Sequence, residues 1–184
     1  MLTIEELVES ASHDMFNPRL NFDIAKKYEE MGQTASAVSF YLRAAEYGYD
    51  SDPLVVYSSL LKMSFCFNDQ NGREHSVKHC MLQAIQYLPN RPEAYFLLSR
   101  YYERNQNWQE CYTWAEVGLT HNSRLEKLPV DVEYYGLYCL EFEKGVAGWW
   151  LGKKEESKQI FEKLLTQNIQ EGYASTIRYN LDRI

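Results

Sequence analysis

Glycine and proline are scarce in this sequence, which has nine glycines and five prolines among 184 residues. These two residues provide most tight turns, so an all-β chain is disfavoured. Long apolar runs are also missing, since none approaches the about 18 residues that a membrane-spanning helix needs. The first ten residues, MLTIEELVES, are acidic where a signal peptide is basic. We therefore expect a soluble, cytoplasmic protein without a membrane partner.

Positive charge is in short supply. The chain has 19 lysines and arginines against 26 aspartates and glutamates, which gives a net charge of −7. Phosphate binding needs a positive face, so a general nucleic-acid binder is disfavoured. Hydrophobic residues make up 45% of the chain, enough for a packed core.

The four cysteines show no CxxC spacing and lie inside helix-like apolar patterns. This pattern favours buried, reduced thiols over a disulfide framework. The residues are Cys66, Cys80, Cys111 and Cys139.

Recognisable catalytic motifs are absent. The glycines are scattered, so no phosphate-binding loop forms, and there is no GxSxG sequence. The Asp50-Ser51-Asp52 sequence has DxD spacing, but it precedes Pro53, where aspartates favour turns and helix caps. We expect a protein that is not an enzyme and has no cofactor.

His75 and His79 lie four positions apart and therefore share a helix face. Such a pair can bind zinc if Cys66 or Asp69 supplies further ligands. The alternative is two surface histidines, which we favour because the sequence shows no complete ligand set. We expect no metal site.

Helical periodicity dominates, and two segments share one pattern. They read NFDIAKKYEEMGQTASAVSFYLRAA from position 21 and YFLLSRYYERNQNWQECYTWAEVGL from position 95. In the first, Ile24, Ala25 and Tyr28 are followed by Gly32 at a turn. The second helices of the two segments carry small residues at matching places, which lets paired helices approach closely.

These residues resemble the tetratricopeptide-repeat (TPR) family. The resemblance implies an all-α, right-handed α-solenoid of stacked antiparallel helix pairs, forming a single domain over residues 1–184. We expect about four repeats between two capping helices. The expected borders are 3–13 for the first cap, 18–50, 53–90, 91–123 and 130–167 for the repeats, and 171–184 for the last helix.

Two repeats depart from the pattern. The second requires about four extra residues, which we place in a turn within FNDQNGREH. The first helix of the fourth repeat is expected to be longer than the others, from about Val132 to Trp150.

The segments NFDIAKKYEEMGQTASAVSFYLRAAE and LPNRPEAYFLLSRYYERNQ also resemble repeats that accompany glycosyltransferases in phages and environmental bacteria. This second resemblance implies a glycosyltransferase partner, and the host cytoplasm as the location if a phage encodes the chain.

The expected concave groove carries a row of basic residues. Each follows a packing position on the first helix of a repeat, and phenylalanines stand four residues earlier in two repeats. This row could hold an acidic peptide or a carboxylate. The alternative is that the charges are solvated and paired with nearby glutamates such as Glu29, Glu30 and Glu103. The candidate groove residues are Phe22, Lys26, Lys62, Phe96, Arg100 and Arg104.

Adjacent residues on a helix point about 100° apart, so at most one of Trp149 and Trp150 is expected to be buried. The other could contact a partner or a sugar, although packing against the capping helix is the favoured interpretation.

The leading hypothesis is a scaffold that binds a peptide or protein segment with an acidic or carboxylate element. The alternatives are an accessory module of glycan synthesis and a structural component of a larger assembly such as a virion.

Overall fold

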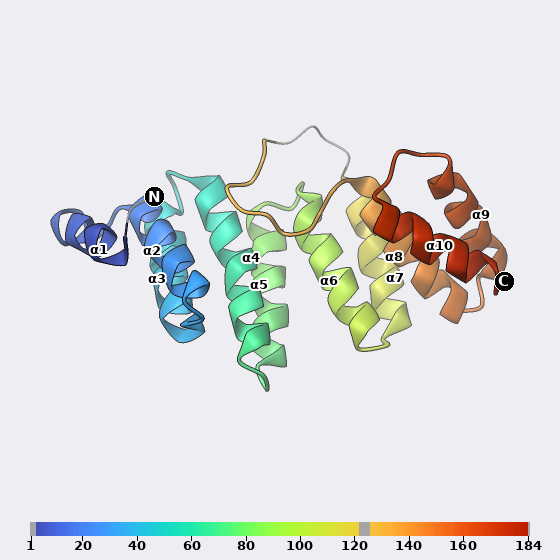
Figure 1. Ribbon diagram of the computed structural model, residues 1–184, viewed down its shortest axis with the longest axis horizontal. Helices are drawn as coiled ribbons and strands as arrows, with labels where there is room; N and C mark the ends of the chain where they lie inside the picture. Colours follow the sequence, from blue (N-terminus) through green and yellow to red (C-terminus); the bar gives the residue numbers. More distant parts are fainter. Residues whose placement is uncertain (1–2, 122–125, 184) are drawn as a thin grey trace. The chain divides into compact units, whose positions relative to one another are not determined.

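The computed structural model describes residues 3–121 and 126–183, which form ten α-helices and no strand (Figure 1). The all-α class is therefore confirmed. None of the helices in these residues is long and apolar enough to cross a membrane. The helices are α1 (Ile4–His13), α2 (Pro18–Glu30), α3 (Thr34–Gly48), α4 (Pro53–Asp69), α5 (Glu74–Tyr87), α6 (Pro92–Arg104), α7 (Trp108–Leu119), α8 (Leu137–Trp150), α9 (Lys154–Leu165) and α10 (Glu171–Leu181).

Proline marks the start of three helices that each open a helix pair. Pro18, Pro53 and Pro92 occupy the first turn of α2, α4 and α6. Proline suits this place because its missing N–H would have no partner there and its φ is already helical. Asn17 and Asp52 cap α2 and α4 by accepting hydrogen bonds from backbone N–H groups.

The turns inside three pairs share one geometry. The second residue after the helix has a positive φ, which lets the chain reverse: 71° at Gly32, 56° at Gln106 and 80° at Gly152. The next N–H then bonds back to the last turn of the helix, from Gln33 to Tyr28 (2.8 Å), Asn107 to Tyr102 (2.9 Å) and Lys153 to Gly148 (2.9 Å).

The extra residues of the second repeat lie mainly in a helix. Helix α4 has 17 residues where α2 and α6 have 13, and only positions 70–73 separate α4 from α5. The expectation of a long turn was wrong because Phe67, Asn68 and Asp69 continue the helix up to the positive-φ Asn71.

Helix α8 begins at Leu137, so the expectation of a long helix from Val132 was wrong. Gly136, with φ of 141°, holds a conformation that ends any helix approaching from its N-terminal side. Positions 126–135 before it are not helical either, and Glu133 among them has a positive φ of 58°.

The chain divides into two compact units, each described by itself. Unit 1 comprises the described residues of Met1–Pro89 and Leu125–Val132, and unit 2 comprises those of Asn90–Arg124 and Glu133–Ile184.

In unit 1, α2 packs on α3, α3 on α4, and α4 on α5, while α1 covers α2. Small residues allow the close approach, since Ala25 and Ala37 have no exposed surface. The ring of Tyr41 fills the space between the helices and is also fully buried.

In unit 2, α6 packs on α7, α7 on α8, and α8 on α9. Ser99 and Cys111 are the small residues that bring α6 and α7 together, and the Ser99 hydroxyl donates to the Cys111 carbonyl at 2.8 Å. Helix α10 closes the unit, with Ile177 packed against Phe161 of α9.

The four cysteines are buried and free, which confirms the expectation. Burial raises the pKa of Cys66 and Cys111 to about 12 and that of Cys80 to about 11, so these thiols stay protonated at neutral pH.

Candidate functional site

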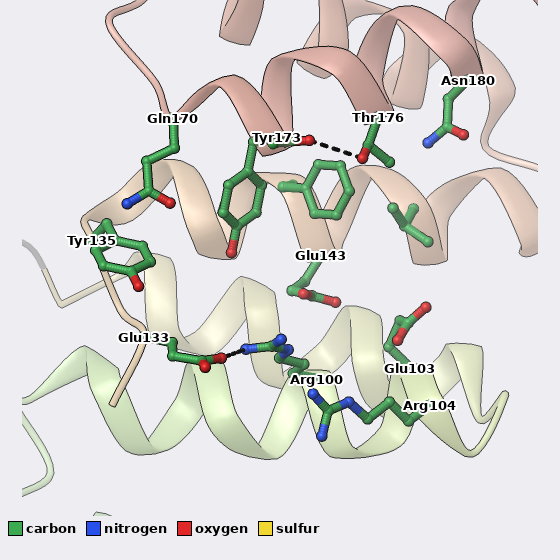
Figure 2. A pocket seen from close by; sticks show the side chains of 13 residues that line it. Arg100, Glu103, Arg104, Glu133, Tyr135, Glu143, Gln170, Tyr173, Thr176 and Asn180 are labelled. Carbon is green, nitrogen blue, oxygen red and sulfur yellow. Dashed lines mark hydrogen bonds and ion pairs between the residues drawn. The ribbon is translucent and has the colours of Figure 1, made fainter. Parts of the chain in front are cut away.

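A pocket of about 630 Å³ lies within unit 2, between α6, α8 and α10 (Figure 2). It brings together residues from both ends of the unit's sequence. Two of the six predicted groove residues, Arg100 and Arg104, contribute to its wall. The lining residues are Arg100, Glu103, Arg104, Glu133, Tyr135, Phe142, Glu143, Val146, Gln170, Gly172, Tyr173, Thr176 and Asn180.

Arg100 is held in place on the pocket wall. Its Nη1 lies 2.7 Å from Oε2 of Glu133, and its guanidinium lies 5.8 Å from the centre of the Phe96 ring, one helical turn earlier. Burial acts to lower the pKa of Arg100, but the hydrogen bond to Glu133 outweighs it and raises the pKa. Arg100 therefore presents a permanent, oriented positive charge.

Arg104 lies one turn further along α6 and is exposed at the pocket. No ion pair involves Arg104 within residues 3–121 and 126–183. Its guanidinium donors are thus available to a ligand.

Glu143 is the unusual residue of the pocket. Its side chain projects from α8 toward the pocket in Figure 2, and the residue is only 4% exposed. Its Oε2 atom has no hydrogen-bond partner in the described part of the chain. Burial raises the pKa of this carboxyl group to about 8, with help from Glu103 and against the lowering effect of Arg100 and Arg104. At neutral pH the group is mainly protonated, so it can donate a hydrogen bond to an oxygen atom that enters the pocket.

Sequence reasoning missed Glu143, although a signal was present. The residue lies four positions after Cys139 and four before Ala147, and all three share one face of α8. Cys139 and Ala147 are fully buried, so the helical period already assigns Glu143 to the buried face.

The other four predicted groove residues lie elsewhere. Phe96 belongs to unit 2 but has no exposed surface, since it packs in the core against Tyr134. Phe22, Lys26 and Lys62 belong to unit 1, where Phe22 is 3% exposed. The two phenylalanines therefore contribute mainly to the cores of their own units.

The basic residues of unit 1 are also ion-paired. Lys26 Nζ lies 2.8 Å from Asp23 on its own helix, and Lys62 pairs with Glu29 of α2. Glu29 was among the expected partners under the alternative interpretation of solvated, paired charges. The six-residue groove as a whole stays a prediction, because its members belong to two units that are described separately.

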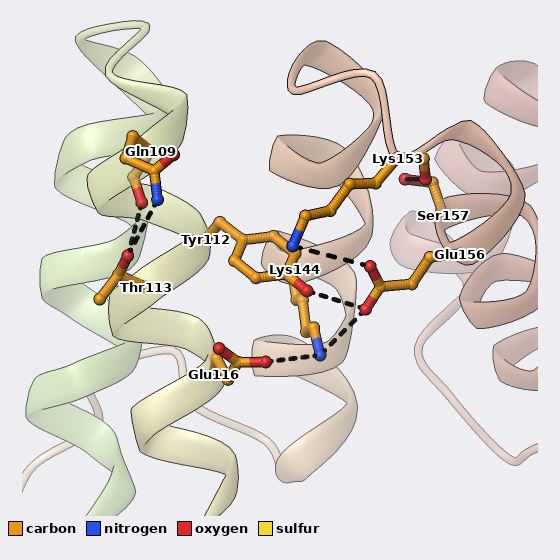
Figure 3. Close-up of polar contacts among 8 residues, drawn as sticks. All are labelled: Gln109, Tyr112, Thr113, Glu116, Lys144, Lys153, Glu156 and Ser157. Atoms are coloured by element: carbon orange, nitrogen blue, oxygen red, sulfur yellow. Dashed lines mark hydrogen bonds and ion pairs between the residues drawn. The ribbon is translucent and has the colours of Figure 1, made fainter.

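Another polar cluster joins α7, α8 and α9 (Figure 3). Lys144 Nζ lies 3.2 Å from Glu116 and 3.1 Å from Glu156, and the Tyr112 hydroxyl donates to Glu156 at 2.8 Å. Burial acts to lower the pKa of Lys144, but its two carboxylate partners raise it on balance. The charges of the cluster neutralise one another. We therefore assign the cluster a structural role in holding the three helices together.

The remaining candidates have plain structural roles. Asp52 caps α4 and lies 2.6 Å from Arg19. His75 and His79 are exposed, and the described residues contain no group of three or more potential metal ligands. Trp150 is 62% exposed and stacks on Trp108 with ring centres 5.2 Å apart.

No family model matches the chain, and no curated protein matches it either. Solved structures do resemble it. MamA shares 15% identity over 89% of this chain and 85% of its own, with a TM-score of 0.67. PilW, a type IV pilus biogenesis factor, shares 13% over 94% and 73%, with a TM-score of 0.66.

A kinesin light chain from P. anserina with nearly identical TPR-like repeats shares 15% identity over 90% of this chain and 83% of its own, with a TM-score of 0.59. Identities this low establish the fold alone. The helix pairs, their turns and these likenesses together show that the chain has an α-solenoid fold of the TPR type.

Proposed function

We propose that this chain is a scaffold that binds a segment of a partner protein, and that the pocket of unit 2 holds an acidic or carboxylate group of that segment. The observation that carries the proposal is the buried Glu143 carboxyl group, whose unpartnered oxygen atom lies at a pocket beside two arginines. A buried polar atom without a partner costs free energy, and a ligand oxygen would satisfy it.

Arg104 is the residue of the pocket whose charge favours an acidic ligand. Glu133 already pairs with Arg100, while Arg104 has its guanidinium donors available. A ligand carboxylate could accept from Arg104 and from the protonated Glu143 together, which would be a pair of strong, directional hydrogen bonds. Glu103 lies at the same wall, close enough to Glu143 to raise its pKa, and would oppose part of the attraction that Arg104 exerts on the acid.

A protein partner is supported by the repeat fold, since stacked helix pairs present surfaces that hold peptide segments. No observation on the structure favours the glycan-synthesis module or the virion component, and both stay predictions. The cytoplasmic location and the lack of enzymatic activity also stay predictions.

The first test uses affinity capture from a lysate of the source organism. We expect the wild-type chain to retain a partner that the Arg104→Glu variant loses, with affinity reduced about tenfold to hundredfold, as for the loss of a hydrogen bond to a charged group. The matched control is Lys158→Glu, which makes the same charge reversal at an exposed residue of α9 outside the pocket.

The acidic element is then tested with synthetic peptides cut from the captured partner. Replacing each aspartate and glutamate of the binding peptide by its amide should identify one whose loss weakens binding to the wild-type chain but not to Arg104→Glu. Equal capture by the wild type and Arg104→Glu would reject the pocket as the binding site, and peptides insensitive to amide replacement would reject the acidic element.

A further inference from the structure

A non-helical stretch of the chain, the 126–132 segment, packs on unit 1. It reads EKLPVDV and its side chains alternate along the sequence. Leu128 is 7% exposed and Val132 is 4% exposed, while Pro129 and Asp131 between them are exposed. The alternation places one side of the segment against a surface, and the backbone bends at Pro129 and Val130.

The surface beneath the segment is the core of unit 1. Val130, the middle residue of the alternating three, packs against the cluster that contains Phe22, Tyr41 and Val55. These residues come from α2, α3 and α4. The segment thus packs Val130 on the core of unit 1, with Leu128 and Val132 buried on either side of it, and forms no helix or strand of its own.

The chain reaches this position by an unusual path. After α5 it forms α6 and α7 of unit 2, and only then contributes the 126–132 segment to unit 1. The whole connection between α7 and α8 covers positions 120–136, whereas the turns inside the pairs are only three or four residues long. Within it the described positions 126–136 form no helix or strand, and long connections of this kind in compact domains are usually functional.

The segment leaves part of the surface free. A second pocket, of about 300 Å³, lies beside it within unit 1. Helices α2 and α4 provide Phe22, Lys26 and Val55, and the segment itself provides Lys127 and Pro129. The 126–132 segment therefore lies in a wider hollow on α2 and α4 that it does not fill.

We propose that this hollow on α2 and α4 is a second binding site, for a non-helical protein segment that bends at a proline and has apolar residues at alternating positions around it, and that the 126–132 segment is its built-in occupant. The partner segment would take the places of Leu128, Val130 and Val132. A tethered occupant acts at an effective concentration in the millimolar range, so the isolated chain is closed to weak competitors. This site is separate from the pocket of unit 2 and does not depend on it.

The test uses the full chain and a fluorescein-labelled synthetic peptide of sequence EKLPVDV, with binding read as fluorescence anisotropy. In the variant Leu128→Ser/Val130→Ser/Val132→Ser the tethered occupant loses its apolar contacts. We expect this variant to bind the peptide saturably and at least tenfold more tightly than the wild-type chain does. A peptide of sequence EKSPSDS should bind neither protein.

Two controls keep the outcome decisive. Far-UV circular dichroism establishes that the variant retains its helices; if it does not, the single variant Val130→Ser replaces it, with a smaller expected gain. Adding Arg104→Glu should leave peptide binding unchanged, which separates this site from the pocket of unit 2. Failure of the peptide to bind a folded variant would overturn the proposal and reduce the segment to a packed linker.

Discussion

Single residues with unusual conformations set the turns of this fold. Within the described residues, four pairs have a positive φ at the second residue after their first helix, and in two of them that residue is glycine. At Gln106 the same conformation carries a side chain, which costs about 1 kcal/mol in the left-handed region.

We expect Gln106→Gly to raise the free energy of unfolding by about 0.5–1 kcal/mol, because glycine adopts this φ without strain. The reverse change, Gly32→Gln, should lower it by a similar amount at the equivalent turn. Urea unfolding followed by circular dichroism measures both. Changes of the same sign in the two variants would contradict the shared turn geometry.

The buried carboxyl group of Glu143 links stability to pH. Its pKa in the folded chain is about 8, against an ordinary value of 4.5. The folded state holds the proton of Glu143 more tightly than the unfolded state does. The stability that this proton contributes is therefore fully present below about pH 4.5 and is progressively lost as the pH rises to about 8. Each unit of pKa difference corresponds to about 1.4 kcal/mol, so the loss amounts to a few kcal/mol.

We expect Glu143→Gln to remove most of this loss, leaving the variant more stable than the wild type at about pH 9. Urea midpoints between about pH 5 and pH 9 test this. Glu162→Gln, at an exposed position of α9, should keep the wild-type pH dependence. If the wild-type chain is as stable at pH 9 as at pH 5, burial does not disfavour the charged form of Glu143.

At this scale the sequence predicts charge better than burial. Arg100 and Arg104 were found because basic residues stand out on an acidic chain. Glu143 was missed because an acidic helical residue is ordinarily solvated, although its spacing from the buried Cys139 and Ala147 indicated the buried face of α8. Phe96 was expected in a groove, but its ring packs against Tyr134. Tyr134 lies in the connection between α7 and α8, whose path the helical period of the sequence does not predict.

At the scale of helices, close packing in unit 2 depends on glycine. A Cβ atom added to Gly145 of α8 would lie 2.7 Å from the Phe161 ring of α9. Phe161 is only 1% exposed, so its ring has little room to move.

We expect Gly145→Ala to lower the free energy of unfolding by about 1–3 kcal/mol, as overpacking does, although alanine is the better helix former. The matched control is Gly172→Ala in α10, where an added Cβ meets nothing within 4 Å. That variant should be neutral or more stable by up to about 1 kcal/mol. Thermal unfolding of both variants measures these changes. A Gly145→Ala variant as stable as the wild type would show that α8 and α9 can move apart to accept the added methyl group.

Helices were predicted well where the period of apolar residues is clean. The small residues Ala25, Ala37, Ser99 and Cys111 lie where paired helices meet. The boundaries of α4 and α8 were misjudged because they depend on backbone conformation at Asn71 and Gly136. An Asn-Gly sequence indicates a turn, but it does not tell how far the preceding helix runs.

At the scale of the whole molecule, repeats explain most of the chain and the 126–132 segment departs from them. Local patterns predict helix pairs because each pair is made of neighbouring residues. No local pattern could place Val130 against the cluster that contains Phe22, since these residues lie far apart in the sequence. Helical spacing did predict Phe22 and Lys26 of the second hollow as groove residues, but it could not predict the 126–132 segment that lies on it.

The placement of the 126–132 segment also orders events during synthesis. A repeat fold is dominated by contacts between neighbouring residues, so its helix pairs can form as they leave the ribosome. Unit 1 is different, because α2 and α4 emerge long before residue 132 does. Closing so long a loop adds little entropy cost, since each doubling of length costs only about 0.6 kcal/mol. The time for which the hollow on α2 and α4 stays uncovered is thus set by translation. During that time the nascent chain can offer this hollow to a partner, before its own 126–132 segment arrives.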